Sequence, residues 1–537
     1  MSFDVAIIGC GPVGGVAANL LGALGLRTAV IEARATPYPL PRAVHLDHEI
    51  MRVLQGAGLA EPMGAVMRAA QGHVHLGADG DVIRYLGHAG GDATPRPHGW
   101  ASDYFFYQPE LETLLRDGLT RFPRVETIAG TVTALEQDDG GVRLSVEGDG
   151  GHREVSAAYA IACDGASSAT RKALGIALDD LGFDEPWLVV DAEVAGPLRF
   201  PPIPGLPLGA DLQQLSVMVC DPRRPATVVP GRGNHRRWEF MLLPGETEEQ
   251  MRDPAVAAAL IAPWVAGLEH RIVRAATYRF HALVADRWQA GRVFLAGDAA
   301  HQTPPFFGQG MCHGVRDVAN LAWKLALVVD GRARTALLDG YQAEREPQVR
   351  AVIAAAIAAG RYICERDPVA AAARDRGLRA AGADRAGRTA AELVTPLAAG
   401  VRIGDARAGE RFVQPRVRTA GGTTMLLDDA VGAGAILLTR GVMRLPESSR
   451  WRFDALEGRI VTIGDGGLID QDGGLGAWFD AGGVDAVLLR PDRYVFGTAH
   501  AGGEAALVED WVDAIAGTND APPPPARAPI LAGEVLA

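Results

Sequence analysis

A glycine-rich turn between an apolar strand and a helix constrains the fold of this chain more than any other feature. Gly9, Gly11 and Gly14 form a G-x-G-x-x-G pattern, with Pro12 inside it, directly after an apolar run that ends at Ile8. The first glycine permits a tight turn, the second lets the backbone approach a pyrophosphate, and the third allows close packing of helix on strand. The pattern and its flanks predict a βαβ dinucleotide-binding unit.

An acidic residue completes this unit. Glu32 stands eighteen residues beyond Gly14, at the end of the second predicted strand, where a carboxylate can accept hydrogen bonds from ribose hydroxyls. The motif alone does not distinguish FAD from NAD(P).

Two later glycine turns favour FAD. Asp164 follows the strand 160–162 and precedes Gly165, and Asp298 follows the strand 292–296. Asp298 can accept hydrogen bonds from a polyol such as ribitol. The turn that comes next contains Pro305, Gly308, Gly310 and Met311 and opens a helix, so its unpaired N–H groups would face the N1/O2 edge of a reduced flavin.

Bulk properties exclude several other classes. A chain of 537 residues predicts two or three domains, and the net charge of -13 without a basic run argues against nucleic-acid binding. Neither a secretory signal nor an apolar run of about 18–20 residues is present, so we expect no membrane partner and a cytoplasmic location. The five cysteines form no C-x-x-C pair, and no metal site is indicated.

The pattern of strands and helices predicts an α/β chain with a discontinuous first domain. Residues 1–182 and 281–400 form the Rossmann-type nucleotide-binding part. Residues 183–280 contain short strands broken by Pro and Gly, which predict an antiparallel sheet that floors a substrate pocket. Residues 401–517 predict a small separate α/β domain, and residues 518–537 a Pro-rich tail.

Together the three glycine motifs resemble the fingerprints of the group A FAD-dependent aromatic hydroxylases, the fold class of para-hydroxybenzoate hydroxylase, over residues 1–400. The stretches 309–311, 316–324 and 341–347 look most like the 3-(3-hydroxyphenyl)propionate hydroxylase and polyketide hydroxylase branch. The resemblance implies that Arg42 and Gln108 contact FAD, that Asp164 serves both FAD and NAD(P)H, and that Asp298 binds ribitol.

The C-terminal segment resembles the thioredoxin-like domain that this branch appends. No cysteine follows Cys364, so thiol–disulfide exchange is excluded there, and a structural or dimer-contact role in a homodimer is the better interpretation.

The resemblance also implies a reaction. NADH or NADPH would reduce FAD, and a flavin C4a-hydroperoxide formed with O2 would hydroxylate a small phenolic substrate without a metal. A 3-(3-hydroxyphenyl)propionate-like acid is one candidate substrate. The alternatives are a polyketide-tailoring aromatic hydroxylase and a non-oxygenating FAD oxidoreductase. A flavin-dependent halogenase is disfavoured because its Trp-x-Trp-x-Ile-Pro signature is absent.

The substrate side of the site is only weakly indicated by the sequence. His45, three residues after Arg42, is the candidate catalytic group on the phenol side, and Tyr104, Tyr107 and Gln214 are candidate substrate contacts. We expect structural roles for His281 and His301. An acidic substrate would need a cationic anchor, for which the sequence offers Arg199, Arg223 and Arg279 without ranking them.

Overall fold

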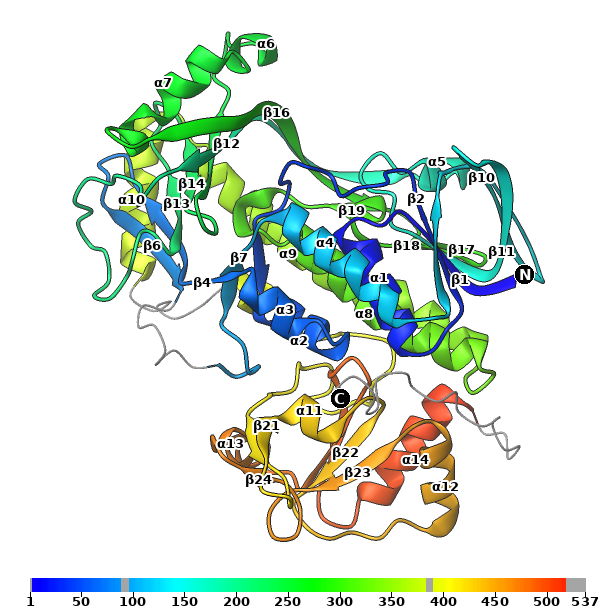
Figure 1. Cartoon of the computed structure of the whole chain (residues 1–537). Helices are drawn as coiled ribbons and strands as arrows, with labels where there is room; N and C mark the ends of the chain where they lie inside the picture. Colours follow the sequence, from blue (N-terminus) through cyan, green and yellow to red (C-terminus); the bar gives the residue numbers. More distant parts are fainter. Residues whose placement is uncertain (1, 88–95, 383–389, 518–537) are drawn as a thin grey trace.

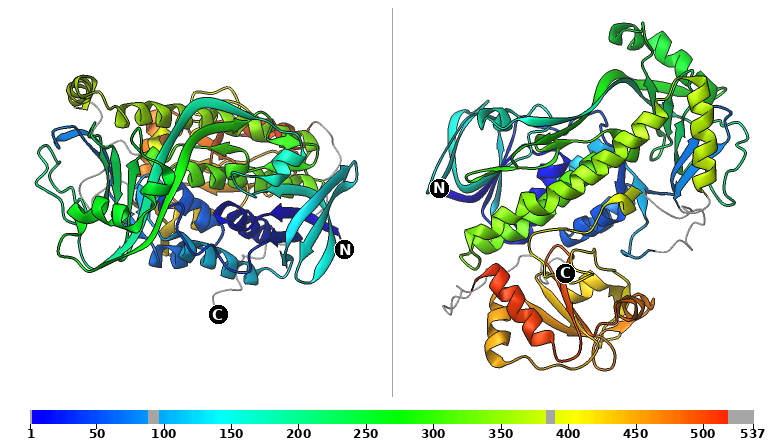
Figure 2. Two further views of the ribbon diagram at one scale, coloured as in Figure 1. Left: turned by 90° about the horizontal axis from the view of Figure 1, so that it is seen from above. Right: turned by 180° about the vertical axis from the view of Figure 1, so that it is seen from behind.

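The computed structural model describes residues 2–87, 96–382 and 390–517. The predicted Pro-rich tail lies outside the described residues. The chain forms two eight-stranded sheets, each in its own part of the molecule, and a smaller C-terminal unit (Figure 1). The C-terminal unit packs beneath the helices of the first unit, and the second sheet lies at the far end from the N-terminus (Figure 2).

The first sheet carries the glycine turn. Its strand order is β17-β18-β11-β1-β2-β8, with β10 and β9 added as a hairpin on β11. The pairs β1–β2, β1–β11, β2–β8 and β11–β18 are parallel, so the carboxyl ends of these strands meet at one edge. The bounds are β1 Ser2–Ile8, β2 Thr28–Glu32, β8 Val125–Ala129, β9 Thr131–Asp138, β10 Gly141–Gly148, β11 Gly151–Ala162, β17 Gln289–Ala290 and β18 Val293–Leu295.

Both faces of β1 are buried, as expected for a central parallel strand. Val5 and Ile7 pack into one hydrophobic cluster, and Ala6 and Ile8 pack into another. The helical side is built from α1 Pro12–Ala23, α2 His48–Gly56, α3 Ala60–Ala65, α4 Gln108–Gly118, α8 Gly310–Val329 and α9 Gly340–Ile363. Helix α5, Ala169–Ala173, follows β11.

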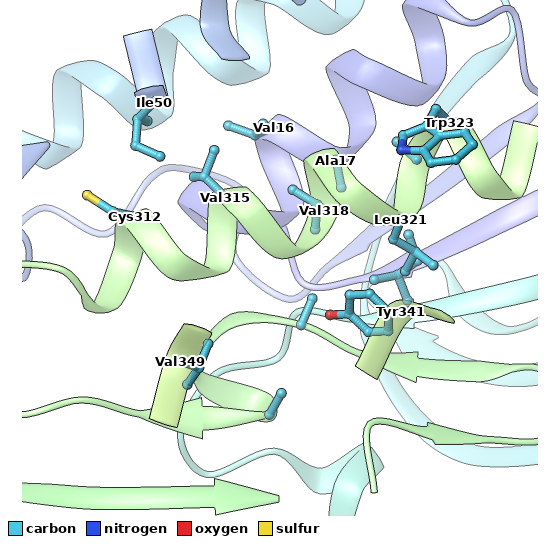
Figure 3. Close-up of a cluster of buried hydrophobic side chains, with 14 of the residues drawn as sticks. Val16, Ala17, Ile50, Cys312, Val315, Val318, Leu321, Trp323, Tyr341 and Val349 are labelled. Atoms are coloured by element: carbon cyan, nitrogen blue, oxygen red, sulfur yellow. The ribbon is translucent and has the colours of Figure 1, made fainter. Parts of the chain in front are cut away.

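Helix α8 is the central element of this core. Its apolar side chains meet those of α1, α2 and α9. In Figure 3, Val315 and Val318 lie toward Val16 and Ala17 of α1, and Leu321 lies on the side of Tyr341 of α9. Because α8 is buried along nearly its whole length, its N-terminus is held rigidly beside the glycine turn of α1.

The second sheet has the order β19-β16-β12-β15-β14-β13-β5-β6. Sequence division placed β5 and β6 in the first domain, but β5 pairs in parallel with β13 and so extends the second sheet. The long strands β12 and β16 connect the two sheets (Figure 1). The bounds are β5 Gly72–Leu76, β6 Val82–Gly87, β12 Leu178–Val194, β13 Leu215–Val219, β14 Ala226–Val229, β15 His235–Met241, β16 His270–Ala285 and β19 His301–Gln302, with α6 Glu248–Met251, α7 Pro254–Val265 and α10 Pro368–Gly382 around them.

A three-stranded sheet, β3-β7-β4, lies between the part that contains the first sheet and the part that contains the second (Figure 1). Its strands are β3 His45–Asp47, β4 Arg68–Ala70 and β7 Asp103–Phe105.

The C-terminal unit has the β-α-β-α-β-β-α order and the 2-1-3-4 strand order of a thioredoxin fold. Its sheet is β23-β22-β25-β26, and the cysteines are all outside it. The bounds are β22 Ile436–Thr439, α12 Glu447–Ala455, β23 Arg459–Thr462, α13 Gly474–Gly482, β25 Ala486–Leu489, β26 Val495–Ala499 and α14 Glu504–Ile515, with β20 Arg416–Arg418, β21 Thr424–Leu426, α11 Leu427–Val431 and β24 Ile469–Asp470 beside them. The expected fold class is confirmed. Within the described residues no helix combines the length and apolar character needed to cross a membrane.

Candidate cofactor and substrate site

The first glycine turn is tightly packed at two positions and open at the third. Gly9 has φ +96°, and a Cβ there would lie 2.6 Å from the Cys163 carbonyl oxygen. A Cβ on Gly14 would lie 2.0 Å from the Gly9 oxygen, whereas a Cβ on Gly11 would meet nothing within 4 Å. The turn therefore leaves free space at Gly11, where the motif requires a pyrophosphate to approach.

Three carboxylates gather at the carboxyl edge of the first sheet. Glu32 ends β2, Asp164 follows β11, and Asp298 follows β18. Glu32 accepts hydrogen bonds from the N–H groups of Cys10 at 2.7 Å and Arg34 at 2.8 Å, which fixes its place against the turn. In an open parallel sheet, ligands bind outside this edge.

Asp164 and Asp298 both offer acceptor atoms to a ligand. Asp164 Oδ2 accepts the N–H of Thr170 at 3.0 Å, but Oδ1 is buried and has no partner among the described residues. The Asp298 side chain is accessible, yet enough protein surrounds it for burial to raise the pKa of its carboxyl. An accessible carboxylate at this edge of the sheet suits hydrogen bonding to a bound polyol.

The turn before α8 supplies donors. Pro305–Phe307 form a short 3-10 turn, Gly308 has φ +63°, and α8 starts at Gly310. The first-turn N–H groups at Gly310 and Met311 have no acceptor within the helix, and a Cβ on Gly310 would meet nothing within 4 Å. This open, positive helix end fits the anionic edge of a reduced flavin.

Arg42 lies in an exposed loop that Gln108 holds in place. Gln108 Oε1 accepts the N–H groups of Arg42 at 3.0 Å and Ala43 at 2.7 Å, and its Nε2 donates to Glu112 at 2.6 Å. The polar atoms of Gln108 are thus engaged inside the protein. Gln108 positions the loop, and the Arg42 guanidinium packs over Tyr38 at 4.7 Å.

His45 lies in a buried pair beside the α8 turn. Its Nε2 is 2.7 Å from Asp103 Oδ1, and both side chains are almost fully buried. Burial acts to lower the pKa of His45, but the hydrogen bond and charge of Asp103 outweigh it, so the pKa is raised. His45 Nδ1 has no partner of normal hydrogen-bond geometry among the described residues, and it faces Gly308.

The other predicted substrate contacts are engaged elsewhere. The Tyr104 hydroxyl accepts the N–H of Ala101 at 3.0 Å. Tyr107 donates to the Pro39 carbonyl and stacks on His235, with ring centres 3.9 Å apart. Gln214 donates to Asp211 at 3.0 Å.

The two histidines expected to be structural have acidic neighbours. His301 Nε2 lies 2.7 Å from Asp317 in the core, and His281 lies 3.6 Å from Asp184 near the surface.

The structure adds two histidines that sequence reasoning did not select. His73 and His75 lie on one face of β5, and the His73 ring centre is 5.5 Å from that of His45. Burial lowers the pKa of His73 to about 4, and neither of its ring nitrogens has a partner among the described residues. The ligand atoms of His45, His73 and Asp103 lie within 4.8 Å of one another, a cluster that sequence spacing concealed because β5 is positioned by its pairing with β13.

A cavity of about 780 Å³ lies apart from this site. It separates α1, α2 and α8 from the C-terminal unit, and ion pairs such as Arg52–Asp428 and Arg316–Glu49 line it. The chemistry indicated by the glycine turns and His45 is therefore located elsewhere.

Comparison with known proteins identifies the cofactor. Residues 2–356 match the model of a family described as FAD binding domain, and residues 409–514 match the HcaD C-terminal domain. The chain belongs to this FAD-binding family. A probable NADH-specific resorcinol 4-hydroxylase from Rhodococcus jostii is 36% identical, with 97% of each chain covered. A 3-(3-hydroxy-phenyl)propionate/3-hydroxycinnamic acid hydroxylase from Burkholderia vietnamiensis is also 36% identical, with 94% of this chain and 95% of that one covered.

Solved structures agree with the fold. OxyS anhydrotetracycline hydroxylase from Streptomyces rimosus is 28% identical, with a TM-score of 0.74 and 95% of this chain and 99% of that one covered. The flavin-dependent monooxygenase PieE has a TM-score of 0.77 over 96% of this chain and 99% of that one; at 23% identity it supports the fold alone. The chain is an FAD-dependent aromatic hydroxylase that uses a nicotinamide co-substrate, as its sequence resemblance implied.

Proposed function

We propose that this hydroxylase acts on a phenol whose hydroxyl group is bound by His45. The observation that carries the proposal is the buried His45–Asp103 pair beside Gly308, where one imidazole nitrogen has no partner of normal hydrogen-bond geometry among the described residues. FAD, when bound, accepts hydride from NADH or NADPH and activates O2.

His45 can act as the proton acceptor for the phenol. Neutral His45 takes the phenolic proton at Nδ1, and Asp103, held at Nε2, stabilises the imidazolium that results. A phenolate ring is richer in electrons and therefore more easily hydroxylated. The burial of both side chains excludes water from this step.

The proposed FAD contacts are the accessible groups of the three glycine turns at the carboxyl edge of the first sheet. Gly9, Gly11, Pro12 and Gly14 form the pyrophosphate turn, and Glu32 lies where adenosine ribose would sit. The unpaired Oδ1 of Asp164, the accessible carboxylate of Asp298 and the donors of the α8 turn support ribitol and flavin contacts there. Arg42 remains a proposed contact of the exposed loop. For Gln108 the structure favours positioning of that loop.

The test uses purified holoenzyme with NADH or NADPH, O2 and a panel of phenols. We expect hydroxylated product coupled to nicotinamide oxidation. His45→Gln should lower product formation by about 100-fold or more, the scale of general-base catalysis, while FAD stays bound. His281→Gln, at the half-buried histidine near Asp184, is the matched control. If wild-type protein forms only hydrogen peroxide, the monooxygenase function fails for those phenols. That result is the one expected of a non-oxygenating FAD oxidoreductase.

Two substrate classes remain within the proposal. The similarity to named phenylpropionate and resorcinol hydroxylases favours a single-ring phenol, and the similarity to an anhydrotetracycline hydroxylase keeps a polyketide substrate as the second candidate. A cytoplasmic location and a homodimer stay predictions.

A further inference from the structure

Several buried polar atoms without partners face one region of the molecule. They include both ring nitrogens of His73, Nε2 of His75 and Nδ1 of His45, and all three side chains are at most 5% exposed. Leaving a buried polar atom unpaired costs about 1–3 kcal/mol, so a row of them indicates a ligand that pairs with them. Because residues two apart on a strand share a face, His73 and His75 point to the same side of β5.

A cationic group lies at the far end of this row. Arg84 on β6 is paired across the hairpin with His75, so the two side chains share a face. Arg84 Nη1 donates to the Tyr362 hydroxyl at 3.3 Å, and that hydroxyl lies 2.9 Å from His75 Nδ1. The three side chains come from β5, β6 and the end of α9 and meet at one point.

Arg84 has no acidic partner in the part of the chain that the structure describes. Among the described residues no carboxylate forms an ion pair with Arg84, and its buried Nε has no partner. Helix α10 packs against β6 and carries Asp375, but this carboxylate is paired with Arg374 at 2.8 Å. A half-buried guanidinium without an acid is the arrangement expected for binding a carboxylate of a ligand.

We propose that Arg84, Tyr362 and His75 form a subsite for a carboxylate on the side chain of the substrate. The subsite lies at the opposite end of the histidine row from the His45–Asp103 pair, which binds the phenol. This inference rests on the proposed function and names its substrate class: a phenol that carries an acidic side chain.

The distance between the two ends of the histidine row distinguishes phenols with an acidic side chain from simple dihydroxybenzenes. His73 and His75 are about 7 Å apart along the strand, and the row extends beyond them to His45 at one end and Arg84 at the other. A phenol with an acidic side chain carries a carboxylate for Arg84 as well as a hydroxyl for His45, whereas resorcinol carries no carboxylate. The three arginines suggested by the sequence, Arg199, Arg223 and Arg279, are all exposed.

The experiment compares three probes on the holoenzyme: 3-(3-hydroxyphenyl)propionate, its neutral propionamide, and resorcinol. Binding is followed by the change each probe causes in the flavin absorbance, and turnover by hydroxylated product. Arg84→Met should weaken binding of the acid by about 30-fold or more and change the two neutral probes by less than about threefold. Arg84→Lys should recover part of the loss, and Tyr362→Phe should weaken the acid by about three- to tenfold.

Arg223→Met is the matched control, since this arginine is exposed and pairs with the neighbouring Asp221. Equal binding of acid and amide by the wild-type protein would overturn the subsite, and so would an equal loss for all probes in Arg84→Met. If Arg84→Met does not fold, Tyr362→Phe decides, because it removes one hydroxyl alone. Hydroxylation of resorcinol without binding of the acid refutes the subsite and leaves the proposed function standing. Peroxide without any hydroxylated phenol refutes the function itself.

Discussion

At the scale of single residues, the glycine turn makes two separable predictions. Gly14→Ala would place a Cβ 2.0 Å from the Gly9 carbonyl oxygen, so we expect both apoprotein stability and FAD binding to fall. Gly11→Ala meets nothing in the protein and should leave the melting temperature of the apoprotein unchanged, while FAD affinity falls at least about tenfold. Thermal unfolding without FAD and fluorescence titration with FAD measure the two effects. Normal FAD affinity in Gly11→Ala would show that the open space is not the pyrophosphate site.

The His45–Asp103 pair predicts a pH dependence. A base acts when deprotonated, so activity should be lost as pH falls through the pKa of His45, which Asp103 raises above its usual 6.5. Asp103→Asn removes the charge that raises it, and we expect the acidic limb of the kcat/KM profile to move to lower pH. Asp184→Asn, beside the half-buried His281, is the control. A limb that stays in place in Asp103→Asn would assign it to another group.

The sequence predicts the arrangement best where the motif is local. Gly9, Gly11 and Gly14 lie within six residues, and the structure has this turn between β1 and α1 as predicted; Asp298 likewise lies in the turn after β18. The phenol side could not be predicted, because His73 reaches His45 only through the pairing of β5 with β13, some 140 residues later. No local pattern signals such a pairing.

At the scale of elements, a buried charge network joins α8 to α9. Glu344 accepts hydrogen bonds from Lys324 at 2.8 Å, Arg490 at 2.7 Å and Asn320 at 2.6 Å. Burial acts against its charge, but Arg490 and Lys324 outweigh it and lower the pKa of Glu344 to about 2. This network could not be predicted from the sequence, because Lys324 and Arg490 belong to different units of the fold.

Glu344→Gln should destabilise the protein by about 3–5 kcal/mol, because it leaves buried cations without their shared carboxylate. The free energy of unfolding in urea measures the loss, where the transition is two-state. Glu136→Gln removes an exposed carboxylate that pairs with Arg143, and we expect less than about 1 kcal/mol from it. Equal losses of unfolding free energy in Glu344→Gln and Glu136→Gln would show that the buried network contributes no more to stability than an exposed ion pair.

At the scale of the whole molecule, the C-terminal unit is connected to the flavin turn by buried polar contacts. Tyr494 donates to Glu49 at 2.7 Å, and Arg316 donates both to Glu49 at 2.6 Å and to Gln309 at 3.0 Å. Gln309 is the residue before α8, so the thioredoxin-like unit supports the N-terminus of that helix from behind. The five cysteines all lie before this unit, so it has no thiol for thiol–disulfide exchange.

This connection predicts an effect on FAD from a residue that does not touch the cofactor site. Tyr494→Phe removes one charge-assisted hydrogen bond, worth about 1.5–3 kcal/mol, and leaves Glu49 with Arg316 and Arg411. If the network sets the position of Gln309, part of that energy appears as weaker FAD binding, of about three- to tenfold, as well as a lower melting temperature. Arg416→Met, which breaks an exposed pair with Asp472 in the same unit, should change neither. A lower melting temperature with unchanged FAD affinity would show that the turn before α8 keeps its geometry without the Tyr494 hydroxyl. The C-terminal unit would then stabilise the fold without affecting the FAD site.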